Sequence, residues 1–211
     1  MRRRRTGLYL IRHCSTAESA LGRCIGRTDV PLSAAGRDCA ESLAAGLAQA
    51  GLDFVYSSPL KRARDTAAPI AARVGGEIGI ADGLVEIDFG SFEGRTFDQI
   101  ATAHPDLYRR WMTTPTEVSF PGGESYADLK TRAVSALEEI AGRHPGAVLA
   151  VVSHGGPIRA ILAGLLRLPD QEAFNLPVDH GAVTLVDGIA EKPRLRFLNL
   201  SARACLEFGT A

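Results

Sequence analysis

The chain has 211 residues, 45% of them hydrophobic, which is enough to bury one sizeable core, so we expect a single domain over residues 1–211. Its 24 basic and 24 acidic side chains give a formal net charge of zero, which argues against nucleic acid as a partner. No run approaches the roughly 20 apolar residues that a membrane span requires, so we expect a cytoplasmic protein with no membrane partner. The basic run Arg2 to Arg5 is expected to be a disordered terminus.

Apolar runs separated by turn signals predict alternating strands and helices along the chain. The expected strands cover residues 6–11, 52–56, 77–80 and 147–152, followed by two consecutive strands, an antiparallel element, at 182–186 and 195–200. The expected helices begin after Ser33, at Ser57-Ser58-Pro59, after Ser125 and at Gly155-Gly156-Pro157. Strands and helices that alternate in this way predict a three-layer α/β/α sandwich around a mostly parallel central sheet.

Residues 95–125 interrupt this alternation. The segment contains Arg109, Arg110, Trp111, three prolines and Gly122-Gly123, a composition that indicates one short helix and an irregular excursion. Such a segment is expected to form a lid over a functional site.

Two histidines directly follow predicted buried strands. His13 comes after the first of them, and His154 comes after the strand at 147–152. Open α/β sheets bind ligands in the crevice outside the carboxyl ends of their strands. A lone histidine there is more often a packing residue, but Arg12 beside His13 provides a phosphate-binding cation next to an imidazole nucleophile. The pair therefore indicates phosphoryl chemistry.

An arginine and an acidic segment add to this pattern. Arg62 falls in the first turn of the helix expected after Ser57, where free N–H groups and the helix dipole attract anions. Taken alone, Arg62 is equally well interpreted as a solvated surface residue. Glu86, Asp88 and Glu93 lie among aromatic residues and glycines, a setting that suits a partly buried acid, and the composition does not choose among the three.

The thiols and histidines give no sign of a metal. The chain has four cysteines, Cys14, Cys24, Cys39 and Cys205. Their spacing matches neither a Cys-x-x-Cys pair nor a disulfide scaffold, so reduced thiols are expected. Cys14 adjoins Arg12 and His13, so it is either a packing thiol or a reactive, redox-active one. Because the histidines also lack zinc-site spacing, we predict no metal.

Four blocks of the sequence carry a more specific signal. They are Leu10-Ile11-Arg12-His13 with Thr16, residues 57–67, residues 86–94, and Ser153-His154-Gly155-Gly156. In this order, between about residues 7 and 205, they resemble the signatures of the histidine phosphatase superfamily in its phosphoglycerate-mutase-like branch. The resemblance implies the phosphoglycerate-mutase-like fold and a metal-independent phosphomonoesterase with no cofactor.

The resemblance also implies a role for each matching residue. His13 matches the nucleophile that becomes a phosphohistidine, and Arg12, Arg62 and His154 match residues that bind the phosphoryl oxygens. Glu86 matches the proton donor, which protonates the leaving alkoxide and then deprotonates the attacking water. The guanidinium groups should disfavour protonation of His13 and stabilise charge on the phosphoryl oxygens.

Three positions depart from the family pattern. Cys14 stands where glycine is common, Ser15 where Glu or Gln is frequent, and Ser19 where an asparagine commonly assists phosphate binding. A Cβ at Cys14 is expected to crowd the phosphate loop, whereas the Ser19 hydroxyl can still donate a hydrogen bond to phosphate. Gly155 is expected to let backbone N–H groups approach the ligand. The departures leave open an inactive relative that binds phosphorylated ligands.

The substrate is a small phosphorylated metabolite on this interpretation. Residues 26–33, 121–125, 178–181 and 198–200 resemble alpha-ribazole phosphatases, which act in cobalamin biosynthesis. The chain has less sequence before its second histidine block than cofactor-dependent phosphoglycerate mutases, so a phosphatase is expected. Phosphoserine, sugar phosphates or many small esters remain open as alternative substrates.

The leaving group is expected to meet side chains of the excursion and of the last loop. Arg109, Trp111 and His180 are the candidates, and Trp111 either stacks on a flat ring or packs into the domain. A homodimer through an exposed apolar helix face is a further possibility.

Overall fold

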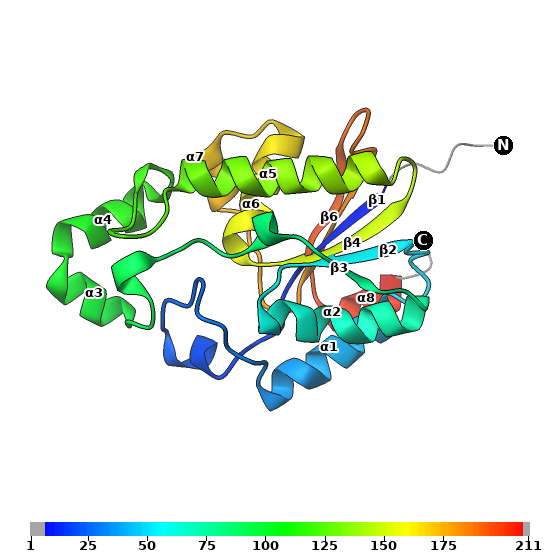
Figure 1. Ribbon diagram of the computed structural model, residues 1–211, viewed down its shortest axis with the longest axis horizontal. Helices are drawn as coiled ribbons and strands as arrows, with labels where there is room; N and C mark the ends of the chain where they lie inside the picture. The colour runs from blue at the N-terminus through cyan, green and yellow to red at the C-terminus, as the bar shows by residue number, and fades with distance from the viewer. Residues whose placement is uncertain (1–6, 209–211) are drawn as a thin grey trace.

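A six-stranded sheet forms the centre of the computed structural model, which describes residues 7–208 and leaves the run Arg2 to Arg5 outside the described residues. The strands are β1 (Gly7–Arg12), β2 (Phe54–Ser57), β3 (Ile78–Ile80), β4 (Val148–Ser153), β5 (Val183–Asp187) and β6 (Arg194–Leu200). Their spatial order is β3-β2-β4-β1-β5-β6. The predicted sandwich with a mostly parallel sheet is confirmed, with helices on both faces (Figure 1).

The two strands that precede the histidines are neighbours. β1 pairs with β4 in parallel, with Leu10 opposite Val151 and Arg12 opposite Ser153. The interior of both strands is buried on both faces, which explains why they read as continuous apolar runs. β5 runs antiparallel to β1 and to β6, so the expected antiparallel element is confirmed. The register brings His13 and His154 to the same edge of the sheet.

Helices α1 (Ala34–Gly46), α2 (Lys61–Val74) and α8 (Ala202–Phe208) cover one face of the sheet (Figure 1). α1 begins where predicted, because the Ser33 side chain accepts a hydrogen bond from the Gly36 N–H. α2 begins later than predicted, with Leu60 rather than a serine at its N-cap. Ser58 does not serve as the helix cap, because its hydroxyl makes a long-range hydrogen bond with the ring of His154.

Helices α5 (Tyr126–Arg143), α6 (Gly155–Leu166) and α7 (Asp170–Phe174) lie on the opposite side (Figure 1). Ser125 caps α5 through a reciprocal capping box with Asp128. The apolar faces of α5 and α6 pack with β1 and β4 around Leu137, Ile158 and Leu162. In residues 7–208, the structure has no helix that is both long and apolar enough to cross a membrane.

The excursion contains two helices, not the single short one predicted. They are α3 (Phe97–Ala103) and α4 (Pro105–Thr113), which lie beyond the edge of the sheet in Figure 1. A capping box between Thr96 and Gln99 starts α3, and Pro105 occupies the first turn of α4. Short 3₁₀ turns cover Glu18–Leu21, Asp82–Leu84, Gly90–Phe92 and Pro115–Glu117.

Candidate active site

Most of the predicted residues converge on a cavity of about 250 Å³ at the carboxyl ends of β1 and β2. Its lining includes the polar side chains of Arg12, His13, Arg62, Glu86 and His180 and the aromatic rings of Phe89, Phe97 and Trp111. The segments that bring these residues together are far apart in sequence. The crevice outside the strand ends is therefore a site with charged and aromatic walls.

His13 is held in one tautomer. Its Nδ1 lies 2.7 Å from the carbonyl oxygen of Cys14, and because a carbonyl can only accept, Nδ1 carries the proton. Nε2 is then unprotonated and accepts a hydrogen bond from Arg62 Nε at 3.3 Å. Burial, followed by the charge of Arg62, holds the pKa of His13 well below its ordinary value. His13 is thus a neutral imidazole with a nucleophilic nitrogen available at neutral pH.

Two arginines flank this imidazole, Arg62 buried and Arg12 partly buried. Arg62 is 1% exposed, and it donates to the carbonyl oxygens of Gly26 at 2.6 Å and Thr28 at 2.9 Å. Arg12 donates to the Val178 carbonyl at 2.6 Å. Burial lowers the pKa of both guanidinium groups, but arginine stays protonated in proteins. Their backbone anchors fix two positive charges beside His13.

His154 lies next to His13, with 5.0 Å between the ring centroids. It is fully buried and is not part of the cavity lining, and its Nε2 is 2.8 Å from the Ser58 hydroxyl. Burial, followed by His13 and Arg62, keeps its pKa well below the ordinary histidine value. Among the described residues, neither His154 Nδ1 nor Arg12 Nε has a hydrogen-bond partner. Two buried polar atoms at this site therefore lack a partner among the described residues, which is uncommon in folded proteins.

Sequence reasoning missed Ser58 as a member of this site. Its hydroxyl pairs with His154 Nε2, and its neighbours Ser57 and Pro59 were interpreted only as helix-start signals. A serine directly after a buried strand, beside a predicted site, was the available signal.

Glu86 lines the cavity at the start of α6, and one of its carboxylate oxygens accepts from the N–H groups of Ile87 at 2.9 Å and Gly156 at 3.2 Å. A Cβ on Gly156 would lie 2.4 Å from this oxygen, so only glycine allows the approach. The carboxylate is therefore placed at a helix N-terminus and faces the cavity.

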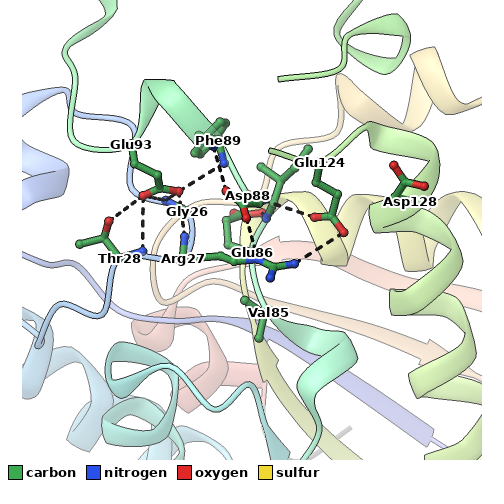
Figure 2. A network of polar contacts seen from close by, with 12 residues as sticks. Gly26, Arg27, Thr28, Val85, Glu86, Asp88, Phe89, Glu93, Glu124 and Asp128 are labelled. Atoms are coloured by element: carbon green, nitrogen blue, oxygen red, sulfur yellow. Dashed lines mark hydrogen bonds and ion pairs between the residues drawn. The ribbon is translucent and has the colours of Figure 1, made fainter. Parts of the chain in front are cut away.

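Glu93, the last of the three acidic candidates, holds a loop. Its carboxylate accepts from the N–H groups of Gly26, Arg27 and Thr28, and from the Thr28 hydroxyl at 2.7 Å (Figure 2). The same loop supplies the two carbonyls that anchor Arg62. Glu93 thus determines the position of Arg62 through the loop 26–28.

Asp88 belongs to a second polar network that supports Glu86. Arg132 donates to the carbonyls of Val85 at 2.5 Å and Glu86 at 3.1 Å, and it pairs with Glu124 at 2.6 Å. Asp88 lies 3.5 Å from Arg27 and accepts from the Gly90 N–H (Figure 2). The fold therefore separates the three carboxylates: Glu86 lines the cavity, whereas Asp88 and Glu93 fix its surroundings.

The aromatic wall comes mainly from the excursion. Trp111 is 9% exposed and packs on Phe97 and Phe120, with ring centroids 5.5 and 5.1 Å away, yet it also lines the cavity. Trp111 therefore packs into the domain as one interpretation predicted, and its stacking on a flat ring stays a prediction. Phe97 is 40% exposed. These rings thus give part of the cavity lining an apolar surface.

His180 enters from the last loop and lies on the other side of His13, with 5.1 Å between the ring centroids. Burial, followed by the charges of Arg12 and Arg62, lowers its pKa to about 4. The structure thus places His180 in the cavity lining, and its contact with a leaving group stays a prediction.

Three predicted contacts need correction or detail. Arg109 does not reach the cavity: its side chain is exposed and pairs with Asp106, because two helical positions place it opposite Trp111 on α4. Ser19 lines the cavity, but its hydroxyl bonds the Thr16 carbonyl at 2.8 Å. Gly155 lies beside the Arg12 guanidinium, because a Cβ built on Gly155 would be 3.6 Å from the central guanidinium carbon of Arg12.

Cys14 does not crowd the cavity as expected. It is fully buried within the apolar cluster under α1, outside the cavity lining, and its N–H donates to the Thr66 hydroxyl at 3.0 Å. The departure from glycine is thus accommodated by packing on the far side of the loop.

This arrangement can transfer a phosphoryl group. It joins a neutral imidazole, two fixed guanidinium groups and a carboxylate within one cavity. Within residues 7–208, no group of three or more His, Cys, Asp or Glu side chains is arranged to hold a metal ion.

Comparisons with known proteins place the chain among phosphatases. The model of the histidine phosphatase superfamily (branch 1) matches residues 8–201. Phosphoserine phosphatase 1 of Hydrogenobacter thermophilus is 35% identical over 179 residues, 85% of this chain and 85% of the relative. A mycobacterial glucosyl-3-phosphoglycerate phosphatase has a TM-score of 0.86 at 28% identity, covering 94% of this chain and 100% of its own. An Escherichia coli protein with a proposed alpha-ribazole-5'-P phosphatase activity has a TM-score of 0.84 at 27% identity. The match covers 92% of this chain and 96% of the Escherichia coli chain.

Proposed function

This chain belongs to the histidine phosphatase superfamily, and from that premise we propose that it hydrolyses phosphomonoesters through a phosphohistidine on His13 without a metal. The observation that carries the proposal is the fixed tautomer of His13, whose Nδ1 proton is held by the Cys14 carbonyl while Nε2 stays unprotonated beside Arg62. An imidazole attacks phosphorus only through an unprotonated nitrogen.

In the first step, His13 Nε2 forms a bond to phosphorus as the bond from phosphorus to the leaving oxygen breaks. Arg12 and Arg62 stabilise the negative charge on the phosphoryl oxygens. The partnerless atoms Arg12 Nε and His154 Nδ1 support this assignment, because buried polar atoms without partners are otherwise unfavourable. His154 thus serves as a phosphoryl ligand behind His13.

Glu86 handles the proton. It protonates the leaving alkoxide in the first step, and in the second it takes a proton from the water that attacks phosphohistidine. Its place in the cavity lining supports both roles. The second step releases inorganic phosphate and restores neutral His13.

For the leaving group, we favour a small metabolite with a flat apolar part, of which alpha-ribazole 5'-phosphate is the example. The aromatic wall of Phe89, Phe97 and Trp111 supports such a group by stacking. The structural likeness to the Escherichia coli protein also supports alpha-ribazole 5'-phosphate as the substrate.

Phosphoserine is the second candidate. The identity with Phosphoserine phosphatase 1 supports it, and Arg23 in the cavity lining offers a cation for a carboxylate. The kcat/KM values for alpha-ribazole phosphate, phosphoserine, 3-phosphoglycerate and fructose 2,6-bisphosphate distinguish the candidates. Equal values for all four would indicate a broad-specificity phosphatase.

A burst experiment tests the mechanism. With p-nitrophenyl phosphate, rapid mixing should release about one equivalent of nitrophenol before the steady state if phosphohistidine hydrolysis is slow. His13→Ala should abolish both the burst and acid-labile phosphate on the protein. Phosphate-competitive binding without turnover or phosphoenzyme would instead identify an inactive binding protein.

A further inference from the structure

Two thiols lie close together near the candidate nucleophile. The sulfurs of Cys14 and Cys39 both lie beside Gly181, where a Cβ would be 2.4 Å from Cys39 Sγ and 3.3 Å from Cys14 Sγ, and Cys39 packs against the apolar cluster that contains Cys14. This proximity follows from the fold. Gly36, in the first turn of α1, packs on the Ser15 backbone, and Cys39 lies one turn further on the same helix.

The two thiols differ in access. Cys14 is fully buried, whereas Cys39 is partly exposed. Cys39 also lines a second cavity of about 580 Å³, bounded by residues of α1, of the loop 179–182 and of the start of α8. A small oxidant can therefore reach Cys39 without entering the phosphate site, whereas Cys14 lines neither cavity.

Access assigns the first step to Cys39, the thiol that is partly exposed and lines a cavity. The electrostatics agree in direction, because the interaction between the two side chains lowers the pKa of Cys39 and raises that of Cys14. The thiolate is the form that reacts with peroxides.

We infer that Cys14 and Cys39 are an oxidisable dithiol site, in which a peroxide converts the neighbouring pair to a disulfide that switches off the adjacent His13. The Cys39 thiolate attacks one oxygen of hydrogen peroxide, forming a sulfenic acid and releasing hydroxide, which becomes water by taking up the proton that the Cys39 thiol lost on ionisation. The sulfur of Cys14 then displaces the sulfenic hydroxyl, which leaves as water when the thiol proton is transferred to it. The two thiols lose two electrons, the peroxide gains them, and the net products are a disulfide and two waters.

The disulfide changes the position of the nucleophile. Bonded sulfurs lie about 2.0 Å apart, much closer than two thiols that are not bonded, so Cys14 or α1 must shift. Cys14 cannot shift alone, because its carbonyl holds His13 Nδ1 and its N–H is bound to Thr66. A displacement of about 1 Å at a catalytic group can cost roughly 10²-fold in rate.

Hydrogen peroxide followed by dithiothreitol tests the inference on the intact protein. The oxidised wild type should lose two hydrogens by denaturing mass spectrometry, yield a peptide pair joined through Cys14 and Cys39, and lose at least about tenfold in kcat, and dithiothreitol should reverse all three. Cys39→Ser should keep basal turnover and resist peroxide. Cys205→Ser, which alters a buried thiol outside the pair, should remain sensitive.

The mass readout stands even if the proposed phosphatase chemistry fails, because it needs no substrate. A different disulfide, or none, overturns the dithiol site. A Cys14–Cys39 disulfide that leaves turnover unchanged overturns the link to His13, as does peroxide inactivation that persists in both Cys39→Ser and Cys39→Ala. Circular dichroism confirms that each variant is folded.

Discussion

The two walls of the cavity are built on different principles. On the phosphoryl side, Arg12 and Arg62 are each fixed by backbone carbonyls, and His13 by the Cys14 carbonyl. On the leaving-group side, Phe97 and Trp111 are placed by aromatic packing alone and offer a surface rather than directed bonds. Hydrogen bonds to the main chain fix geometry to within tenths of an ångström, whereas packing tolerates change. Under the proposed function, the phosphoryl wall carries the reaction and the aromatic wall selects the substrate.

Glu86→Gln gives the largest expected effect, on the phosphoryl side. Loss of the general acid and base should lower kcat by about 10² to 10⁴-fold, while phosphohistidine stays detectable because His13 is intact. Quenched-flow measurements with a labelled substrate record both quantities. Unchanged turnover would remove Glu86 from the mechanism.

Glu93→Gln should have the next largest effect, although Glu93 is not in the cavity lining. Its carboxylate holds the loop 26–28, so the variant should misplace Arg62 and lower kcat/KM by about 10 to 100-fold. Steady-state kinetics on the folded variant measure this change. Glu139→Gln is the matched control, because Glu139 is exposed and pairs only with Arg143 among the described residues. Equal kinetics in the two variants would contradict the role of Glu93.

Phe97→Ala should alter substrate choice without altering chemistry. Removing this ring takes away one stacking surface worth about 1 kcal/mol, so kcat/KM for alpha-ribazole phosphate should fall several-fold relative to that for phosphoserine. Met112→Ala, which removes another exposed apolar side chain, outside the cavity lining, should leave the ratio unchanged. If Phe97→Ala leaves the ratio of the two kcat/KM values unchanged, the aromatic wall does not determine substrate specificity.

The smallest expected effect concerns pH and stability. His180 has a folded pKa of about 4, so between pH 6.5 and 4 the unfolded chain binds a proton that the folded chain does not. Stability should therefore fall as the pH is lowered through this window. His180→Asn should show a smaller fall in the free energy of unfolding, measured by urea titration at pH 7 and pH 4.5. Parallel losses in both proteins would contradict this linkage.

Much of the fold was predictable from local patterns, because strands buried on both faces are apolar throughout and the helix caps Ser33 and Ser125 are local signals. The positions of His13 and His154 followed from the ends of those strands. What the sequence could not provide depends on long-range contacts. The separate roles of Glu86 and Glu93 depend on residues 156 and 26–28, and Arg109 was misplaced because only the packing of α4 decides which face meets the cavity.

The position of β1 in the sheet has a consequence for how the molecule is made. β1 is the first described strand to leave the ribosome, yet its described ladder partners, β4 and β5, begin at Val148 and Val183. Contacts so distant in sequence are entropically costly and form late in folding. The strand that ends at Arg12, just before His13, therefore stays unpaired until β4 and β5 have been synthesised. The nascent protein should acquire its phosphoryl-binding centre as one of its last folding events.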